Sequence, residues 1–239
     1  MASSTSSTSR CSRSKFRADS FPLWKGRGTF GCPALFVCGW QHGAMSSLRD
    51  FFDYFSGIDR QAGMRRLGDE MYVLPFLTPL YCRALIDAAE ATGAFAQDPG
   101  DPVPGVELSI ARMSPVVFEA MENDIGARIW PQLQSEWEYI DYHGINDAFI
   151  IKYEIGGQES LRIHHDVAQV SMSVKLNDDY EGAELDFPRQ GVTNAAVGVG
   201  ELLVWPSLVT HPHASLQITS GVKYSLTIWC ELPLAMNRM

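Results

Sequence analysis

The chain has 239 residues, of which 46% are hydrophobic and 11% aromatic, and its formal net charge is −9. This size allows one domain with a sizeable core, and no apolar run approaches the roughly 20 residues that span a membrane, so we expect no membrane partner. Residues 45–239 hold 13 basic and 27 acidic side chains, and a body this acidic argues against nucleic acid as a partner.

The cysteines do not have the number or the spacing of a disulfide framework or a zinc site, because there are five of them and no C-x-x-C occurs. They indicate free thiols in a reducing compartment, and we therefore expect a cytoplasmic protein. The five are Cys11, Cys32, Cys38, Cys82 and Cys230.

The first 44 residues differ from the rest of the chain. Residues 2–14 are rich in Ser, Thr and Arg and contain no acidic residue, a composition that cannot fold by itself. Three interpretations stay open: a disordered extension, a non-native extension ahead of a true start at Met45, and an organelle-targeting peptide. We therefore assign residues 45–239 to a single domain and leave residues 1–44 out of the fold.

The residues that follow position 70 predict a strand and then a helix. Residues 71–76 have the pattern of a short strand that ends near Pro75. Thr78 can cap a helix with Pro79 at its first position, and apolar residues at helical spacing continue this helix to about Thr92.

The remainder of the chain predicts a loop, one more helix and then short strands. Residues 98–105 predict a loop, residues 106–111 a strand, and residues 116–139 a second helix that Pro131 should kink or divide. Two helices followed by many strands predict an α+β domain with a barrel or double-sheet core. The later predicted strands are 148–153, 169–176, 183–187, 201–205 and 223–232.

A His-x-Asp motif at His164 and Asp166 is the first candidate site. In an extended segment residues i and i+2 point to the same side, so both can face one metal ion while His165 points away. A third ligand from elsewhere would complete a face of two imidazoles and one carboxylate, which leaves three positions open on a six-coordinate ferrous ion. The alternative for an isolated His-x-Asp is a surface turn.

A second group of candidates lies downstream of that motif. His211 and His213 lie at the end of a unit long enough for three short strands, and both remain candidates for the third ligand. The strand from Lys223 alternates a cation and two hydroxyls with apolar residues, which is typical of a solvated face. If Lys223 points into a barrel, its charge requires a partner, and a dicarboxylate would supply one.

Taken together, these segments resemble the iron- and 2-oxoglutarate-dependent dioxygenases. Residues 148–232 are most similar to the procollagen lysyl hydroxylase catalytic domain and the related prolyl 4-hydroxylase family, and a weaker likeness extends back to about residue 70. The segments that carry the resemblance are Phe149–Tyr153, Ser160–Asp166, Val174–Asn177, Tyr180–Gly182, Gly200–Trp205, Leu208–His213 and Gly221–Trp229.

The resemblance implies a choice between the two downstream histidines. In this family the distal His precedes the basic residue that binds the cosubstrate by ten positions, which His213 and Lys223 satisfy and His211 does not. The lysyl branch usually has Arg at the position of Lys223, whereas the prolyl branch uses Lys. At this position the ammonium group of Lys therefore replaces an Arg guanidinium group, which could bind a carboxylate through two parallel hydrogen bonds.

The resemblance also implies a fold, a set of cofactors and a reaction. The fold is a double-stranded β-helix (jelly-roll) over residues 148–232 with supporting N-terminal helices. Fe(2+), 2-oxoglutarate, O2 and L-ascorbate as reductant would support hydroxylation of an unactivated C–H bond, with decarboxylation of 2-oxoglutarate to succinate and CO2. The implied metal ligands are His164, Asp166 and His213, and the implied cosubstrate residues are Lys223, Tyr153, Ser173 and Ser225.

The substrate that this resemblance implies is an amino acid or a peptidyl side chain of the Lys or Pro kind. Three alternatives stay open: the same chemistry on another small metabolite, a catalytically silent double-stranded β-helix that binds a ligand or partner, and a zinc or manganese cupin-like enzyme. The last would use His164, His165, His211 and His213. Residues 98–105 and 154–160 are candidates for a lid over the site.

Overall fold

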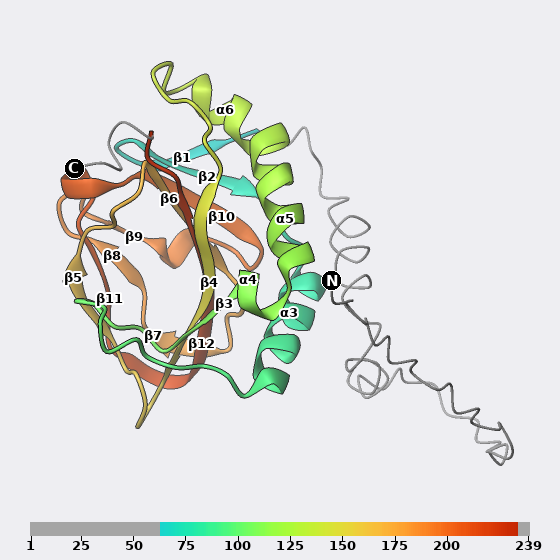
Figure 1. The fold of residues 1–239 in the computed structure, drawn as a ribbon. Helices are drawn as coiled ribbons and strands as arrows, with labels where there is room; N and C mark the ends of the chain where they lie inside the picture. Colours follow the sequence, from blue (N-terminus) through green and yellow to red (C-terminus); the bar gives the residue numbers. More distant parts are fainter. Residues whose placement is uncertain (1–62, 234–239) are drawn as a thin grey trace, which may run out of the picture. The chain divides into compact units, whose positions relative to one another are not determined.

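The computed structural model describes residues 63–233, and Figure 1 shows their arrangement. The predicted extension at residues 1–44 and the predicted start of the domain at residues 45–62 lie outside the described residues. Within residues 63–233 the strands form two antiparallel sheets, as a double-sheet core requires.

The larger sheet has eight strands and the smaller one four. The order in the larger sheet is β1 (Arg65–Gly68), β2 (Met71–Pro75), β10 (Glu201–Pro206), β6 (Val170–Lys175), β12 (Ile218–Cys230), β4 (Ile145–Glu154) and β3 (Glu107–Ser109), with β7 (Tyr180–Gly182) also paired to β12. The order in the smaller sheet is β5 (Leu161–His164), β11 (His213–Ser215), β8 (Leu185–Phe187) and β9 (Val192–Thr193).

The first predicted helix is confirmed as α3 (Pro79–Thr92). The hydroxyl of Thr78 accepts a hydrogen bond from the Tyr81 N–H at 3.2 Å, and Pro79 lies in the first turn, where its missing N–H costs nothing. Gly93 ends the helix with φ of 58°, a left-handed conformation that suits glycine.

The second predicted helix is divided into three parts. They are α5 (Pro115–Asp124), the π-helical turn η1 (Ile125–Ile129) and α6 (Trp130–Gln134), with Pro131 in the first turn of α6. A proline ring clashes with the carbonyl group four residues before it, and the wider π turn accommodates this clash. The predicted strand at 106–111 was too long, because α4 (Ile110–Met113) begins directly after β3.

Residues 63–233 also contain two short 3-10 turns, η2 (Asn194–Ala196) and η3 (Leu208–Thr210). No helix in residues 63–233 is long and apolar enough to cross a membrane.

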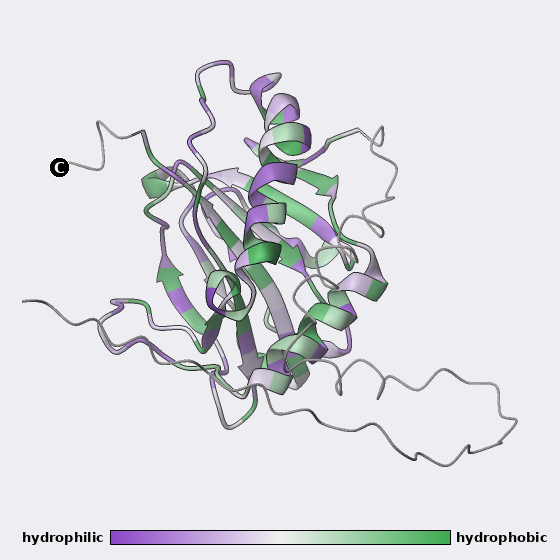
Figure 2. Cartoon of the chain, turned by 45° about the vertical axis from the view of Figure 1, so that its right-hand side comes forward, coloured by the Kyte–Doolittle hydropathy of each residue, from purple (hydrophilic) through white to green (hydrophobic). Residues whose placement is uncertain are grey.

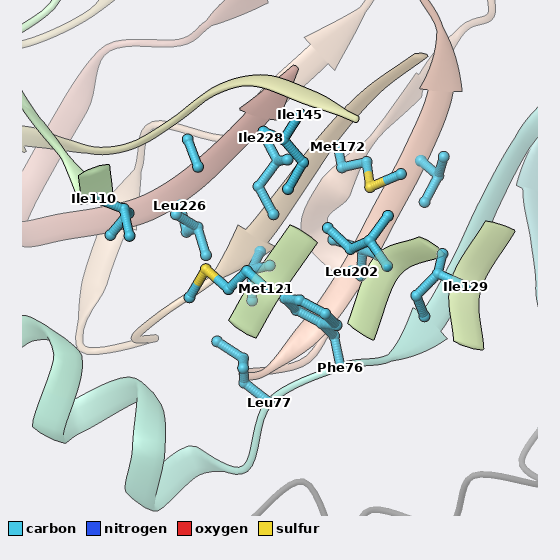
Figure 3. Close-up of a cluster of buried hydrophobic side chains, with 14 of the residues drawn as sticks. Phe76, Leu77, Ile110, Met121, Ile129, Ile145, Met172, Leu202, Leu226 and Ile228 are labelled. Atoms are coloured by element: carbon cyan, nitrogen blue, oxygen red, sulfur yellow. The ribbon is translucent and has the colours of Figure 1, made fainter. Parts of the chain in front are cut away.

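One face of the larger sheet packs against the helices, which lie along one side of it in Figure 1. Figure 3 shows part of this buried cluster, with Met121 near Leu226 of β12 and Ile129 near Leu202 of β10. Figure 2 shows hydrophobic residues recurring along the central strands, while the long helices carry both hydrophobic and hydrophilic residues. Burial of each large aliphatic side chain contributes about 1.5–3 kcal/mol relative to its exposure.

The opposite face of the larger sheet is turned toward the smaller sheet. At one end the two sheets are joined by an apolar cluster in which Phe187 of β8 packs with Leu203 and Trp205 of β10. Phe187 and Trp205 meet edge to face with ring centroids 5.1 Å apart. Trp205 of this cluster also lines a cavity whose wall is formed by residues of both sheets.

Candidate active site

The pairing of β5 with β11 brings the predicted metal-binding residues together. His164 ends β5 and His213 begins β11, and the two are opposite each other in the antiparallel register. A bulge separates this pair from the next one, Leu161 with Ser215, so that Leu161 and His164 both face the space between the sheets. Asp166 follows two residues after His164, and one ligand atom of each of the three residues lies within 4.8 Å of the others.

Hydrogen bonds orient both imidazole rings toward the Asp166 carboxylate. Nδ1 of His164 lies 2.9 Å from the Arg162 carbonyl oxygen, and Nδ1 of His213 lies 3.0 Å from the His211 carbonyl oxygen. Because a carbonyl oxygen only accepts, each Nδ1 carries the proton and each Nε2 presents a lone pair. The Nε2 atoms of His164 and His213 lie 3.6 and 3.7 Å from the two carboxylate oxygens of Asp166.

This donor set suits a divalent cation. Lone pairs of two imidazoles and a carboxylate converge with no proton between them, an arrangement that is repulsive unless a positive charge lies among them. Burial is the main cause that lowers the pKa of His213, and His164 adds to this effect while Asp166 opposes it. A neutral imidazole is the form that binds a metal ion.

The other two histidines of this region do not join the cluster. His165 is exposed at the cavity, although the sequence predicted that it would point away. His211 is buried, and its ring nitrogens lie 3.0 Å from the Thr210 hydroxyl and 3.0 Å from the Asp69 carbonyl oxygen. The four-histidine site of the cupin-like alternative is therefore not assembled.

A cavity of about 290 Å³ connects the cluster with the predicted cosubstrate residues. Tyr153 of β4, Ser173 of β6, and Lys223 and Ser225 of β12 all line it. Alternation along β12 explains this, since Leu226 and the other intervening residues point to the opposite, helix-covered face. Of the two candidate lid segments, residues 98–105 contribute to the cavity wall and residues 154–160 do not.

Lys223 is a buried cation at the end of this cavity. Its side chain is 3% exposed, and Nζ donates hydrogen bonds to the Ala183 carbonyl oxygen at 2.6 Å and to the Ser215 hydroxyl at 3.2 Å. Nζ also lies 4.7 Å from the centroid of the Tyr153 ring. Burial lowers the pKa of Lys223 to about 7, against a weaker opposing effect of Glu184. Such a cation favours an anionic ligand.

Comparisons with known proteins agree with this geometry, although no family model matches the chain. A multifunctional procollagen lysine hydroxylase and glycosyltransferase of Caenorhabditis elegans is 27% identical over 175 residues, and a procollagen-lysine,2-oxoglutarate 5-dioxygenase 1 of Rattus norvegicus is 26% identical over 170. Each match covers 65% of this chain and 23% of the relative, so the chain spans about a quarter of the length of these proteins.

Solved structures show the same fold. The 2OG complex of a viral collagen prolyl hydroxylase from Paramecium Bursaria Chlorella virus-1 has a TM-score of 0.53 at 20% identity, with 69% of this chain and 98% of that chain covered. A Pseudomonas putida prolyl-4-hydroxylase has a TM-score of 0.50 at 18% identity, with 79% and 99% covered. These proteins are iron- and 2-oxoglutarate-dependent dioxygenases, and the chain is similar to them in sequence and in fold. The predicted resemblance to this superfamily is thereby confirmed.

In this cavity, two contacts were not predicted from the sequence. Ser215 accepts a hydrogen bond from Lys223, and it lies two residues after His213 on the same strand. Strand alternation could have indicated it, had β11 been predicted. The second contact is the Ala183 carbonyl oxygen. Ala183 has φ of 55°, a left-handed conformation that is rare for residues other than glycine and that no sequence pattern signals.

Glu107 is a further residue of the cavity that the sequence did not single out. It lies on β3 opposite Ile151, and within residues 63–233 its carboxylate has no hydrogen bond or ion pair. Burial, and then the negative charges of Asp147, Asp101 and Asp98, raise the pKa of Glu107 to about 7, against a weaker opposing effect of Arg112. The cavity wall thus holds the buried Lys223 ammonium group and the Glu107 carboxylate, which forms no ion pair within residues 63–233.

Proposed function

We propose that the chain is an Fe(II)- and 2-oxoglutarate-dependent hydroxylase that acts on an unactivated C–H bond of an amino acid or a peptidyl side chain. The single observation that carries this proposal is the joint presence of the His164–Asp166–His213 cluster and Lys223 in one cavity. We also assign the two sheets to a double-stranded β-helix, with its core at about residues 148–232.

The metal would be held by Nε2 of His164, Nε2 of His213 and the carboxylate of Asp166. These three groups come from one side, which leaves positions for a cosubstrate and for dioxygen. When bound, iron and 2-oxoglutarate supply the oxidising chemistry, with release of succinate and CO2. The protein contributes fixed imidazole orientations and a buried carboxylate, so that little reorganisation accompanies metal binding.

Lys223 would pair with the carboxylate of 2-oxoglutarate that is remote from the metal. Its present partners, a carbonyl and a hydroxyl, are neutral, so an incoming carboxylate offers a much stronger interaction. Tyr153, Ser173 and Ser225 line the same region and would contact the cosubstrate. L-Ascorbate as a reductant is part of this proposal.

Glu107 supports a substrate that carries a positive charge. A half-buried carboxylate without an ion-pair partner is costly, and an ammonium group of the substrate would stabilise it. The cavity volume of about 290 Å³ lies at the lower end of the range for small-molecule sites, which suits one side chain of a lysine-like residue or a free amino acid.

Succinate formation tests the reaction, and product mass tests the substrate. Purified protein with Fe(II), ascorbate and 2-oxoglutarate should form succinate slowly without substrate and faster with a correct one. A screen of amino acids and short peptides should then reveal a product heavier by one oxygen atom. The matched control is His213→Ala, which removes a metal ligand. Iron-loaded protein that forms no succinate with any of these compounds would favour the silent binding module.

A further inference from the structure

Two buried serine hydroxyls are linked to the Asp166 carboxylate, and neither serine is among the residues that line the cavity. The Ser171 hydroxyl is 2.6 Å from Oδ2 of Asp166, and the Ser207 hydroxyl is 2.7 Å from the Ser171 hydroxyl. Ser171 is fully buried and Ser207 is 5% exposed, so water does not replace these contacts. Ser171 lies on β6, and Ser207 directly follows β10.

The direction of these hydrogen bonds follows from the chemistry of the acceptor. An ionised carboxylate only accepts, so Ser171 donates to Asp166. Since a hydroxyl has one proton, Ser171 must accept from Ser207, which gives a chain from Ser207 through Ser171 to Asp166. The distance of 2.6 Å is that of a charge-assisted bond between a hydroxyl and a carboxylate.

The segment that begins at Ser207 also supports the backbone of the same aspartate. The Leu208 N–H donates to the Asp166 carbonyl oxygen at 2.9 Å, and Leu208 adopts φ of 61°, a strained conformation for a leucine. Farther along, the His211 carbonyl oxygen accepts from Nδ1 of His213. One short segment therefore makes contacts that hold both Asp166 and His213.

We propose that the Ser207–Ser171 hydroxyl pair is a positioning device that sets the rotation of the Asp166 carboxylate for metal binding. This inference rests on the proposed metal site. Oδ2 accepts the hydrogen bond from Ser171, which fixes the carboxylate plane while Oδ1 lies 3.6 Å from Nε2 of His164 and Oδ2 lies 3.7 Å from Nε2 of His213. Neither serine would contact the metal.

A serial arrangement makes a specific prediction for the two serines. Loss of partners that orient metal ligands typically weakens metal affinity by 10- to 100-fold, and we expect Ser171→Ala to fall in this range. Ser207→Ala should have a smaller effect, because the bond from Ser171 to Asp166 remains. The double variant should bind no more weakly than Ser171→Ala alone, since Ser207 acts only through Ser171.

Cobalt(II) titration of the full chain, followed by the visible absorption of the bound ion, measures these affinities. Ser220→Ala, which alters an exposed serine of β12, is the matched control. The absorption bands of Co(II) bound to Ser171→Ala should differ in intensity from those of the wild type, because the ligand geometry changes. Urea unfolding of the metal-free variants separates a loss of stability from a loss of affinity.

The outcomes are distinct. If the wild-type protein binds no Co(II), the proposed metal site and this inference both fail. If the wild type binds and Ser171→Ala binds within twofold with unchanged absorption, only the positioning role is overturned, even where the variant is less stable. Losses that add in the double variant would likewise contradict the serial arrangement of Ser207 and Ser171.

Discussion

Replacement of Lys223 by methionine should change protein stability and cosubstrate affinity in opposite directions. Methionine keeps a long unbranched side chain but removes the ammonium group of Lys223, a residue that is 3% exposed in the cavity wall. The carbonyl oxygen of Ala183 keeps a partner in the variant, because the Ser215 hydroxyl also donates to it at 3.3 Å. The substitution therefore removes one buried charge and orphans no backbone group.

The gain in stability follows from the pKa of Lys223, which burial lowers from 10.5 to about 7. The unfolded chain binds more protons than the folded one between these two pH values, so stability rises with pH across this interval. Below pH 7 Lys223 is charged in the folded protein, and the full cost of burying this charge is present. Each pH unit by which the pKa is lowered corresponds to about 1.4 kcal/mol, so the cost is roughly 5 kcal/mol. Metal-free Lys223→Met should thus be more stable than wild type at pH 6, by up to this amount.

The loss of affinity follows from the removal of one partner of a buried charged pair. Such truncations cost about 2–4 kcal/mol, which corresponds to a 30- to 1,000-fold weaker binding of 2-oxoglutarate. In the wild type the affinity should also fall as pH rises above about 7, because the free protein then loses the proton of Lys223. Glu184 and Lys175 are the charged groups that act on Lys223, and they oppose each other.

Urea unfolding in EDTA at pH 6 and pH 9.5, together with calorimetric titration of 2-oxoglutarate, measures both effects. The difference in stability between variant and wild type should shrink at the higher pH. Lys152→Met is the control, because this cation is paired with Glu90 and Glu154 at 3.1 and 3.3 Å and its removal should not stabilise the protein. A less stable Lys223→Met variant that binds 2-oxoglutarate normally would refute the reasoning.

Three further substitutions test the site and the fold. His213→Ala should weaken Co(II) binding by more than 100-fold, because it removes a proposed metal ligand. His211→Ala should weaken it by about tenfold or less, because the backbone carbonyl group of residue 211, which accepts from Nδ1 of His213, remains. Equal losses in the two variants would contradict the choice of His213 as the ligand. Glu107→Gln should raise the KM of a lysine-like substrate about tenfold or more, and an equal change for a neutral analogue of the same length would oppose the cation-binding role. Gly200→Ala should destabilise the protein by about 2 kcal/mol or more in thermal unfolding, because Gly200 has φ of 83° and an added Cβ would overlap a backbone carbonyl oxygen. Gly198→Ala, where the added Cβ makes ordinary contacts, should be nearly neutral by comparison.

Local patterns predicted the elements that depend on the chain's own periodicity. The Thr78 cap and Pro79 marked the start of α3, and alternation along β12 separated Lys223 and Ser225 from the apolar residues of the opposite face. Both succeed because a helix and a strand impose a fixed repeat on which side chains share a face. The same reasoning placed the start of β12 five residues too late, since the strand continues through Gly221 to Ile218.

The sequence did not predict the short strands that are defined mainly by their hydrogen bonds to neighbouring strands. β5 and β11 have four and three residues, too few for a pattern to be recognised, yet their register places His164 opposite His213. The choice of His213 over His211 came from its spacing to Lys223 by way of the family resemblance. In the structure, the pairing of these two strands places His213 beside His164 and Asp166, and the choice of ligand stays a prediction.

The amino-acid sequence by itself determined which chemical groups are available and in what order: two imidazoles, a carboxylate and a cation on segments of known periodicity. Only the tertiary structure decided which polar groups stand behind them, such as Ser171 and Ser207, and that Glu107 faces the same cavity. The physical reason is that periodicity acts within a segment. Contacts between segments depend on register, bulges and burial, which the whole fold sets together.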